Sequence, residues 1–181
     1  MRTITSIFTA IAALTLTSCI TISGLDKRAS GPIEERTFNI EGDIRALASS
    51  CGAEVTVDST LPRGKVRVVT NSDIYDIIEI KAKESSLEIG LKSGEHLRAD
   101  TFEVYVPAYD YNTVAISGGA DLEWHDSKAQ MLTVAASGGA DAEITTLSER
   151  VALAVSGGAD VELKGSSKQL SISASGGADV D

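Results

Sequence analysis

Apolar and polar positions repeat with a period of 19 to 20 residues in the second half of the chain. The pentapeptide Ser-Gly-Gly-Ala-Asp begins at Ser117, Ser137, Ser156 and Ser175, with spacings of 20, 19 and 19 residues. The flanking residues alternate in polarity, and a period of two residues is typical of strands rather than helices. Because a unit this short cannot bury its apolar face alone, the repeats predict stacked coils around a shared core.

The Ser-Gly-Gly part of each motif is predicted to form a corner, since glycine accepts a positive φ at low cost. The predicted repeat-turn residues are Ser117, Gly118, Gly119, Ser137, Gly138, Gly139, Ser156, Gly157, Gly158, Ser175, Gly176 and Gly177. A degenerate fifth copy lies upstream as Ser50-Cys51-Gly52-Ala53-Glu54-Val55. Its Cys51 stands where the other copies have their first glycine, which makes that corner the unusual one.

The alternation also predicts which side chains face the core. In the third unit we expect Leu153, Val155, Val161 and Leu163 to point inward and Asp160 to point outward. Trp124 occupies the position of Ile144 and Leu163 in the later units, so we expect it to pack in the core rather than to serve as a ligand platform.

The stretch before the repeats is β-rich but less regular. Its candidate strands are 36–40, 53–57, 65–70, 77–82, 87–91 and 102–106, with a hairpin turn at Glu84-Ser85-Ser86. No helical period of useful length occurs after the N-terminal segment. The pattern therefore predicts an all-β chain whose C-terminal part, from about residue 112, is a β-solenoid with 19–20-residue coils.

The first 19 residues look like an export signal with a lipid attachment site. Arg2 precedes a short apolar, Thr-rich segment, which is typical of a secretory signal peptide. Its end, Leu16-Thr17-Ser18-Cys19, resembles a bacterial lipobox, so we predict a signal peptide at 1–18, lipidation of Cys19 and a tether at 19–34. An ordinary signal peptide with an incidental cysteine is the alternative. Ile20 follows Cys19, where some retained lipoproteins have Asp, and this favours the outer membrane.

Composition excludes several classes of protein. Asp+Glu 26 against Lys+Arg 16 gives a net charge of −10, which argues against a nucleic-acid partner because phosphates require a basic surface. The two histidines have no metal-site spacing. Aromatic residues make up only 4%, as suits a narrow core of Val, Ile, Leu and Ala.

Stacked coils would place the acidic residues of the motifs in columns, with neighbours about 4.8 Å apart. The column is Asp121, Asp141, Asp160 and Asp179, beside a second column of Glu123, Glu143 and Glu162. Three interpretations remain open. Each Asp accepts hydrogen bonds that structure the turn, the columns form a solvated surface screened by salt, or the four Asp hold Ca²⁺ or another hard cation. No other cofactor is expected.

Catalysis is not favoured by these residues. The carboxylates are repeated rather than paired, and the motif serines have no histidine beside them in the sequence. His96 and His125 are isolated in the sequence, and we interpret them as surface residues. We therefore assign no catalytic residue.

Several segments together resemble a known family. They are Thr37-Phe38-Asn39-Ile40, Ala53-Glu54-Val55-Thr56-Val57, Ser85-Ser86-Leu87-Glu88-Ile89, Tyr105-Val106-Pro107 and the serial Ser-Gly-Gly-Ala-Asp units. They resemble the putative auto-transporter adhesin head domain, or GIN domain (DUF2807), from about Arg36 to Asp181. The resemblance implies a right-handed parallel β-helix spanning 35–181 in a bacterial envelope protein, with no established catalytic residues.

The combined expectation is a non-enzymatic envelope lipoprotein that is anchored in the membrane and binds a glycan or a protein. The alternatives are a purely structural envelope lipoprotein and a β-helix carbohydrate-active enzyme. No polar capping segment follows the fourth motif before Asp181. Either the sequence continues beyond Asp181, or the open coil edge associates with another copy or a partner.

Overall fold

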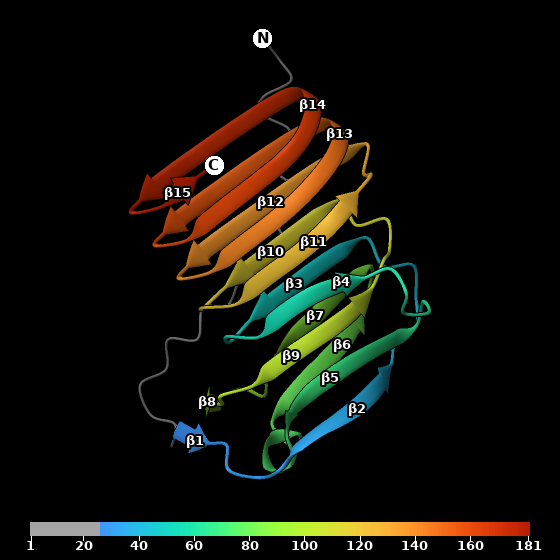
Figure 1. Ribbon diagram of the computed structural model, residues 1–181, viewed down its shortest axis with the longest axis vertical. Coiled ribbons are helices and arrows are strands. Elements are labelled where there is room, and N and C mark those ends of the chain that lie inside the picture. Colours follow the sequence, from blue (N-terminus) through green and yellow to red (C-terminus); the bar gives the residue numbers. More distant parts are fainter. Residues whose placement is uncertain (1–25) are drawn as a thin grey trace.

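The computed structural model describes residues 26–181, which are almost entirely β-structure (Figure 1). The strands are β1 (Asp26–Arg28), β2 (Ile33–Asn39), β3 (Ala46–Ser50), β4 (Glu54–Asp58), β5 (Lys65–Asn71), β6 (Ile78–Lys83), β7 (Ser86–Leu91), β8 (His96–Arg98), β9 (Phe102–Pro107), β10 (Thr113–Ser117), β11 (Asp121–Ser127), β12 (Met131–Gly138), β13 (Asp141–Gly157), β14 (Asp160–Gly176) and β15 (Asp179–Val180). One 3-10 helix, η1 (Ser72–Ile74), interrupts them. The all-β prediction is confirmed.

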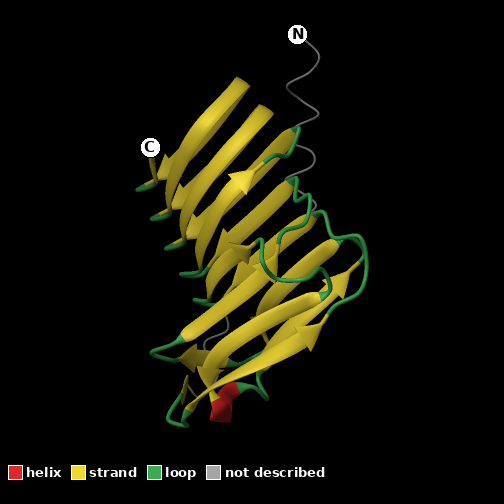
Figure 2. Cartoon of the chain, turned by 45° about the vertical axis from the view of Figure 1, so that its right-hand side comes forward, coloured by secondary structure: helices red, strands yellow, loops and turns green. Residues whose placement is uncertain are grey.

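Thirteen of the strands form one sheet that folds back on itself into two layers (Figures 1 and 2). The long strand β13 belongs to both layers, because its first half pairs with β11 and its second half pairs with β12. The first layer contains β2, β5, β9, β4, β11, the first halves of β13 and β14, and β15. The second layer contains β6, β7, β3, β10, β12 and the second halves of β13 and β14.

The repeats pair in parallel and in register, one unit against the next. Ser117 pairs with Ser137, Ser137 with Ser156, and Ser156 with Ser175. The sheet as a whole is mixed, however, because β2–β5, β5–β9 and β6–β7 are antiparallel. The β6–β7 pair is the predicted hairpin, and strands joined by so tight a turn must run antiparallel.

The hydrophobic core lies between the two layers and follows the predicted alternation. Leu153, Val155 and Val161 are buried and Asp160 is exposed, while Leu163 is half-buried beside the last coil. Trp124 is only 4% exposed and packs edge-on against buried Tyr111, with 5.8 Å between ring centroids. The prediction that Trp124 is a core residue is confirmed.

The degenerate fifth copy is also confirmed. β3 and β4 pair with β10 and β11 so that Ser50 stands beside Ser117 and Glu54 beside Asp121. Cys51 adopts φ 88°, in the region taken by the first glycine of the other corners. The six candidate strands upstream of the repeats are present, with ends shifted by a few residues. β1, β3 and β8 were not anticipated. β1 and β8 have three residues each, which are too few to show a period, and β3 is a short strand that ends at the serine of the degenerate copy.

The predicted N-terminal features fall mostly outside the described residues. The signal peptide at 1–18, Cys19 and the first part of the tether lie there. The remainder of the predicted tether, residues 26–34, contains β1, which pairs with β8, and the start of β2. Residues 26–34 therefore pair with other strands of the domain.

Candidate functional site

The corners of the repeats depend on the first glycine of each motif. Gly118, Gly138, Gly157 and Gly176 adopt φ values of 67°, 81°, 80° and 79°. Residues other than glycine rarely adopt this left-handed backbone conformation, because their Cβ comes too close to the carbonyl oxygen. The second glycine has a positive φ only in the first corner, where Gly119 has φ 76°. The predicted repeat-turn residues are therefore not equivalent, and only the first glycine has the same constraint in every corner.

Successive corners also stack without space for a side chain. A Cβ added to Gly157 would lie 2.9 Å from the carbonyl oxygen of Gly138, and one added to Gly176 would lie 2.8 Å from that of Gly157. The close approach lets the amide of Gly158 donate to Gly138 at 2.7 Å and that of Gly177 donate to Gly157 at 2.7 Å. The corners thus continue the hydrogen-bond ladder from one layer to the other.

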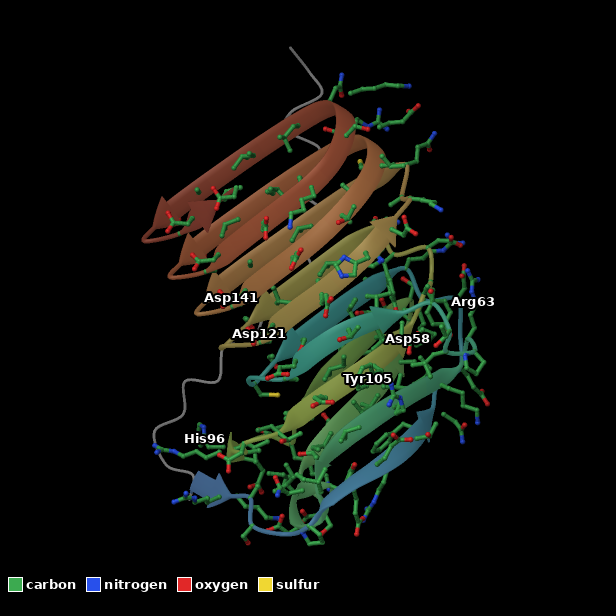
Figure 3. The ribbon with its side chains drawn as sticks, in the orientation of Figure 1. Asp58, Arg63, His96, Tyr105, Asp121 and Asp141 are labelled. Atoms are coloured by element: carbon green, nitrogen blue, oxygen red, sulfur yellow. The ribbon has the colours of Figure 1, made fainter. Side chains whose placement is uncertain are left out.

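Each corner delivers its acidic residue to the outer side of the first layer. The alanine of the motif is fully buried in the first three copies, and the following Asp begins the next strand. Parallel register aligns Asp121, Asp141, Asp160 and Asp179, which we call the Asp row. It aligns Glu123, Glu143 and Glu162 as the Glu row. Figure 3 labels Asp121 and Asp141 at the starts of neighbouring strands.

The two rows line a shallow groove of about 560 Å³ along the first layer. Its lining runs from Glu54, Val55 and Thr56 on β4 to Asp179 and Asp181 at the other end. The apolar residues that alternate with the carboxylates, such as Leu122 and Val161, are buried. The carboxylates therefore lie on the outer side of the layer.

The rows differ in how their charges are balanced. Lys164 donates to Glu143 and Glu162 at 2.9 Å each, which lowers the pKa of Glu143 and raises that of Lys164 to about 12. His125 lies 2.7 Å from Glu123. Within residues 26–181 no ion pair involves the Asp row. Partial desolvation, together with the charge of Asp141, raises the pKa of Asp121.

The described part of the chain contains no group of three or more His, Cys, Asp or Glu side chains placed to hold a metal ion. The Asp row is one carboxylate wide, so its geometry does not supply the several oxygen ligands that Ca²⁺ requires. The backbone amide of Asp141 donates to the carbonyl oxygen of Ala120 at 3.2 Å, which links the two corners at the start of their strands.

The structure places the residues weighed for catalysis on different elements. The motif serines stand at or near the ends of β10, β12, β13 and β14, in the second layer. His125 is on β11 of the first layer beside Glu123, and His96 is on β8 in the small sheet with β1. The motif serines and the two histidines therefore lie on different elements.

Sequence reasoning missed a cluster of tyrosine and arginine side chains next to the groove. Tyr105 is paired with Thr56, which is paired with Glu123, so Tyr105 extends the line of the Glu row onto β9. The Arg67 guanidinium lies 3.8 Å from the centroid of its ring, and the Tyr105 hydroxyl donates to Glu103 at 2.7 Å. The alternation in 102–106 indicates that Tyr105 faces outward, but no sequence pattern pairs it with Arg67.

Comparison with known proteins identifies relatives by family and by fold. The family model described as the putative auto-transporter adhesin, head GIN domain, matches residues 43–181. None of the curated proteins matches the sequence. Within residues 26–181 there is no helix with the length and apolar character needed to span a bilayer.

Solved structures with similar folds have very different sequences. A putative adhesin from Parabacteroides distasonis has a TM-score of 0.57 at 14% identity, over 84% of this chain and 74% of that one. A putative lipid binding protein from the same species has a TM-score of 0.52 at 12% identity, over 87% and 100%. A putative adhesin from Bacteroides fragilis has a TM-score of 0.50 at 13% identity, over 85% and 98%. At these identities the likeness shows the fold alone.

Proposed function

The chain belongs to the family of the putative auto-transporter adhesin head GIN domain, and from this membership we propose that it is a non-enzymatic binding module of the bacterial cell envelope. The observation that carries the proposal is the groove along the first layer, where parallel register repeats the same carboxylates from coil to coil. A repeated surface of this kind suits an extended glycan or protein that makes the same contact several times.

The Asp row is proposed as the principal contact. Its carboxylates accept hydrogen bonds from hydroxyl, amide or ammonium groups, and no ion pair among the described residues, 26–181, already occupies them. The Glu row, by contrast, is partly neutralised by Lys164, which pairs with Glu143 and Glu162. A ligand that donates hydrogen bonds at intervals of about 4.8 Å would match the spacing between strands.

Attachment to the membrane is proposed to occur through Cys19. The lipobox-like sequence Leu16-Thr17-Ser18-Cys19 supports lipidation, and Ile20 after the cysteine supports the outer membrane. Two or more acyl chains give stable attachment, because each buried methylene contributes about 0.8 kcal/mol. Lipidation would hold the groove in the envelope without any membrane-spanning helix.

The coils are proposed to wind as a right-handed β-solenoid. The parallel pairing of consecutive units supports this winding, since connections between parallel strands of one sheet are right-handed in about 98% of cases. An experimental structure with left-handed coils would contradict it.

Binding is tested with the full chain on a glycan array and in pull-downs from envelope extracts. In the test variant, Asp121, Asp141, Asp160 and Asp179 are replaced by Asn. A matched control replaces four exposed carboxylates outside the groove, Glu41, Glu84, Glu88 and Asp100, by their amides. Both variants change the net charge by the same amount.

We expect the Asp-row variant to lose at least tenfold in affinity for the ligand and the control to bind as the unmodified chain does. Equal losses in the two variants would mean that net charge, not the groove, governs binding. Absence of any ligand in both assays would overturn the binding role in favour of a structural one.

A further inference from the structure

The second half of β14 presents a strand edge that is unpaired within the described residues. β14 pairs with β13 on one side, and on its other side β15 and Asp181 pair only with the first residues of β14, Asp160 to Leu163. Leu170 and Ile172 on this edge are 53% and 49% exposed. The sequence from Gln169 to Gly176 contains no charged residue. Exposed edges in soluble proteins usually carry charges that prevent pairing.

The opposite end of the sheet is protected in that way. Its edge strands are β2, which carries Glu34, Glu35 and Arg36, and β6, which carries Lys81 and Lys83. The second half of β14 is therefore the edge whose uncharged sequence favours pairing with a further strand. Ile172 continues a core column formed by Val134 and Leu153, so an added strand would need an apolar residue at that position.

One segment outside the described residues has the required pattern. Ile20-Thr21-Ile22-Ser23-Gly24 alternates apolar and polar residues and ends in Ser-Gly. The strand β10 with its corner reads Val114-Ala115-Ile116-Ser117-Gly118, and β14 ends Ile172-Ser173-Ala174-Ser175-Gly176. Aligned on Ser-Gly, Ile20 stands beside Ile172 and Ile22 beside Ala174. The segment thus has the pattern of a repeat strand with its corner.

The segment cannot reach the β14 edge of its own chain. Figure 1 shows β1 and β8 at the end of the molecule opposite β14. In the second layer, six strand spacings separate β7 from a strand added beyond β14, which is about 29 Å at about 4.8 Å each. With Gly24 placed beside Gly176, only residue 25 precedes Asp26, and two steps of extended chain span about 7 Å.

We propose that residues 20–24 of one copy form a parallel strand on the β14 edge of a second copy. The donated strand would place Ile20 beside Ile172 and Ile22 beside Ala174 and would pair the edge backbone, as in other cases of strand addition. Each copy has one donor segment and one acceptor edge. The association is therefore head-to-tail and forms open chains or closed rings rather than symmetric dimers. It is independent of the proposed ligand groove.

Disulfide trapping with the full chain tests the proposal. Thr21→Cys and Ser173→Cys would lie on neighbouring strands, within the Cα separation that a disulfide tolerates. Both are made in a Cys51→Gly background so that Cys51 does not react. The control pair joins Thr21→Cys with Thr145→Cys, which is on the first half of β13 in the other layer. A further control carries Ser173→Cys alone. Any dimer that it forms shows that the new thiol at 173 reacts with Cys19 or with the same thiol of a second copy.

We expect the Thr21→Cys/Ser173→Cys protein to give a ladder of dimers, trimers and larger species on a non-reducing gel. A mixture of the two single variants should stop at dimers. A substitution Ile172→Lys in the trapping pair should reduce the ladder at least tenfold, whereas Leu147→Lys, at an exposed apolar residue off the edge, should not. Equal ladders from the control pair, dimers from Ser173→Cys alone, or no cross-linked species would each overturn the proposal.

Discussion

The corner glycines provide a prediction in which two neighbouring residues should respond in opposite ways. Gly157 has φ 80°, and a Cβ there would lie 2.9 Å from the oxygen and 3.0 Å from the nitrogen of Gly138. Gly158, the next residue, does not have a positive φ. A Cβ at Gly158 would make its nearest contact at 3.6 Å, with the oxygen of Gly138. Alanine should therefore be unfavourable at 157 and tolerated at 158.

The magnitude at Gly157 has two sources. Placing a side chain in the left-handed region costs about 1–2 kcal/mol. Moving the corner away from Gly138 also weakens the hydrogen bond from the amide of Gly158 to the carbonyl oxygen of Gly138, worth about 0.5–1.5 kcal/mol. We expect Gly157→Ala to lower the free energy of unfolding by about 2–3 kcal/mol. Gly158→Ala should change it little or raise it by about 0.4–1 kcal/mol, because alanine restricts the unfolded chain.

Both variants are compared with the unmodified chain by urea denaturation followed by far-ultraviolet circular dichroism. Gly139→Ala serves as a second control, because a Cβ there meets nothing within 4 Å and its φ is not positive. Equal destabilisation by Gly157→Ala and Gly158→Ala would refute the argument. It would mean that the motif requires glycine for a reason other than conformation and close stacking.

Three further substitutions test other parts of the structure. Cys51→Gly should raise the thermal midpoint by the equivalent of about 0.5–1 kcal/mol, because φ 88° is strained for cysteine but not for glycine; a lower midpoint in a thermal melt would contradict this. Folding raises the pKa of Asp121 through burial and the charge of Asp141, so stability is lost as the carboxyl ionises with rising pH. Asp121→Asn should therefore stabilise the chain by a few tenths of a kcal/mol at pH 7, and the gain in urea titrations should disappear below the pKa of Asp121. Trp124→Ala should cost about 3–5 kcal/mol in the same titrations, since it empties a buried site against Tyr111; a loss below 1 kcal/mol would place Trp124 outside the core.

The repeats made much of the fold predictable from the sequence. Four copies of one motif define where strands begin, which residues face inward and which residues of successive units pair. The degenerate copy at Ser50 could be aligned with them even though Cys51 replaces a glycine, because the pattern around it is preserved. These inferences depend on the local alternation of apolar and polar residues and on the repeat period, and both can be read from the sequence alone.

The mixed pairing of the N-terminal part could not be predicted in the same way. Strands such as β2, β5 and β9 have no repeat that sets their order, and neighbours in the sheet are distant in the sequence. The contact between Arg67 and Tyr105 follows from that order, so it was missed as well. The Asp and Glu rows were predicted from the period, but the bridge from Lys164 to Glu143 and Glu162 required side-chain positions.

The near-identity of the repeats also has a consequence for folding. Units that differ so little can pair one whole coil out of step and still match Ser with Ser and Gly with Gly, which creates competing partly folded states of similar energy. Tyr111 and Trp124 lie at the junction between the irregular part and the repeats, and later units have Ile144 and Leu163 in the place of Trp124. If a later unit paired with β3 and β4 instead of the first unit, the edge-on contact with Tyr111 would be lost. This aromatic pair thereby favours the native register over the other, nearly equivalent pairings of the coils.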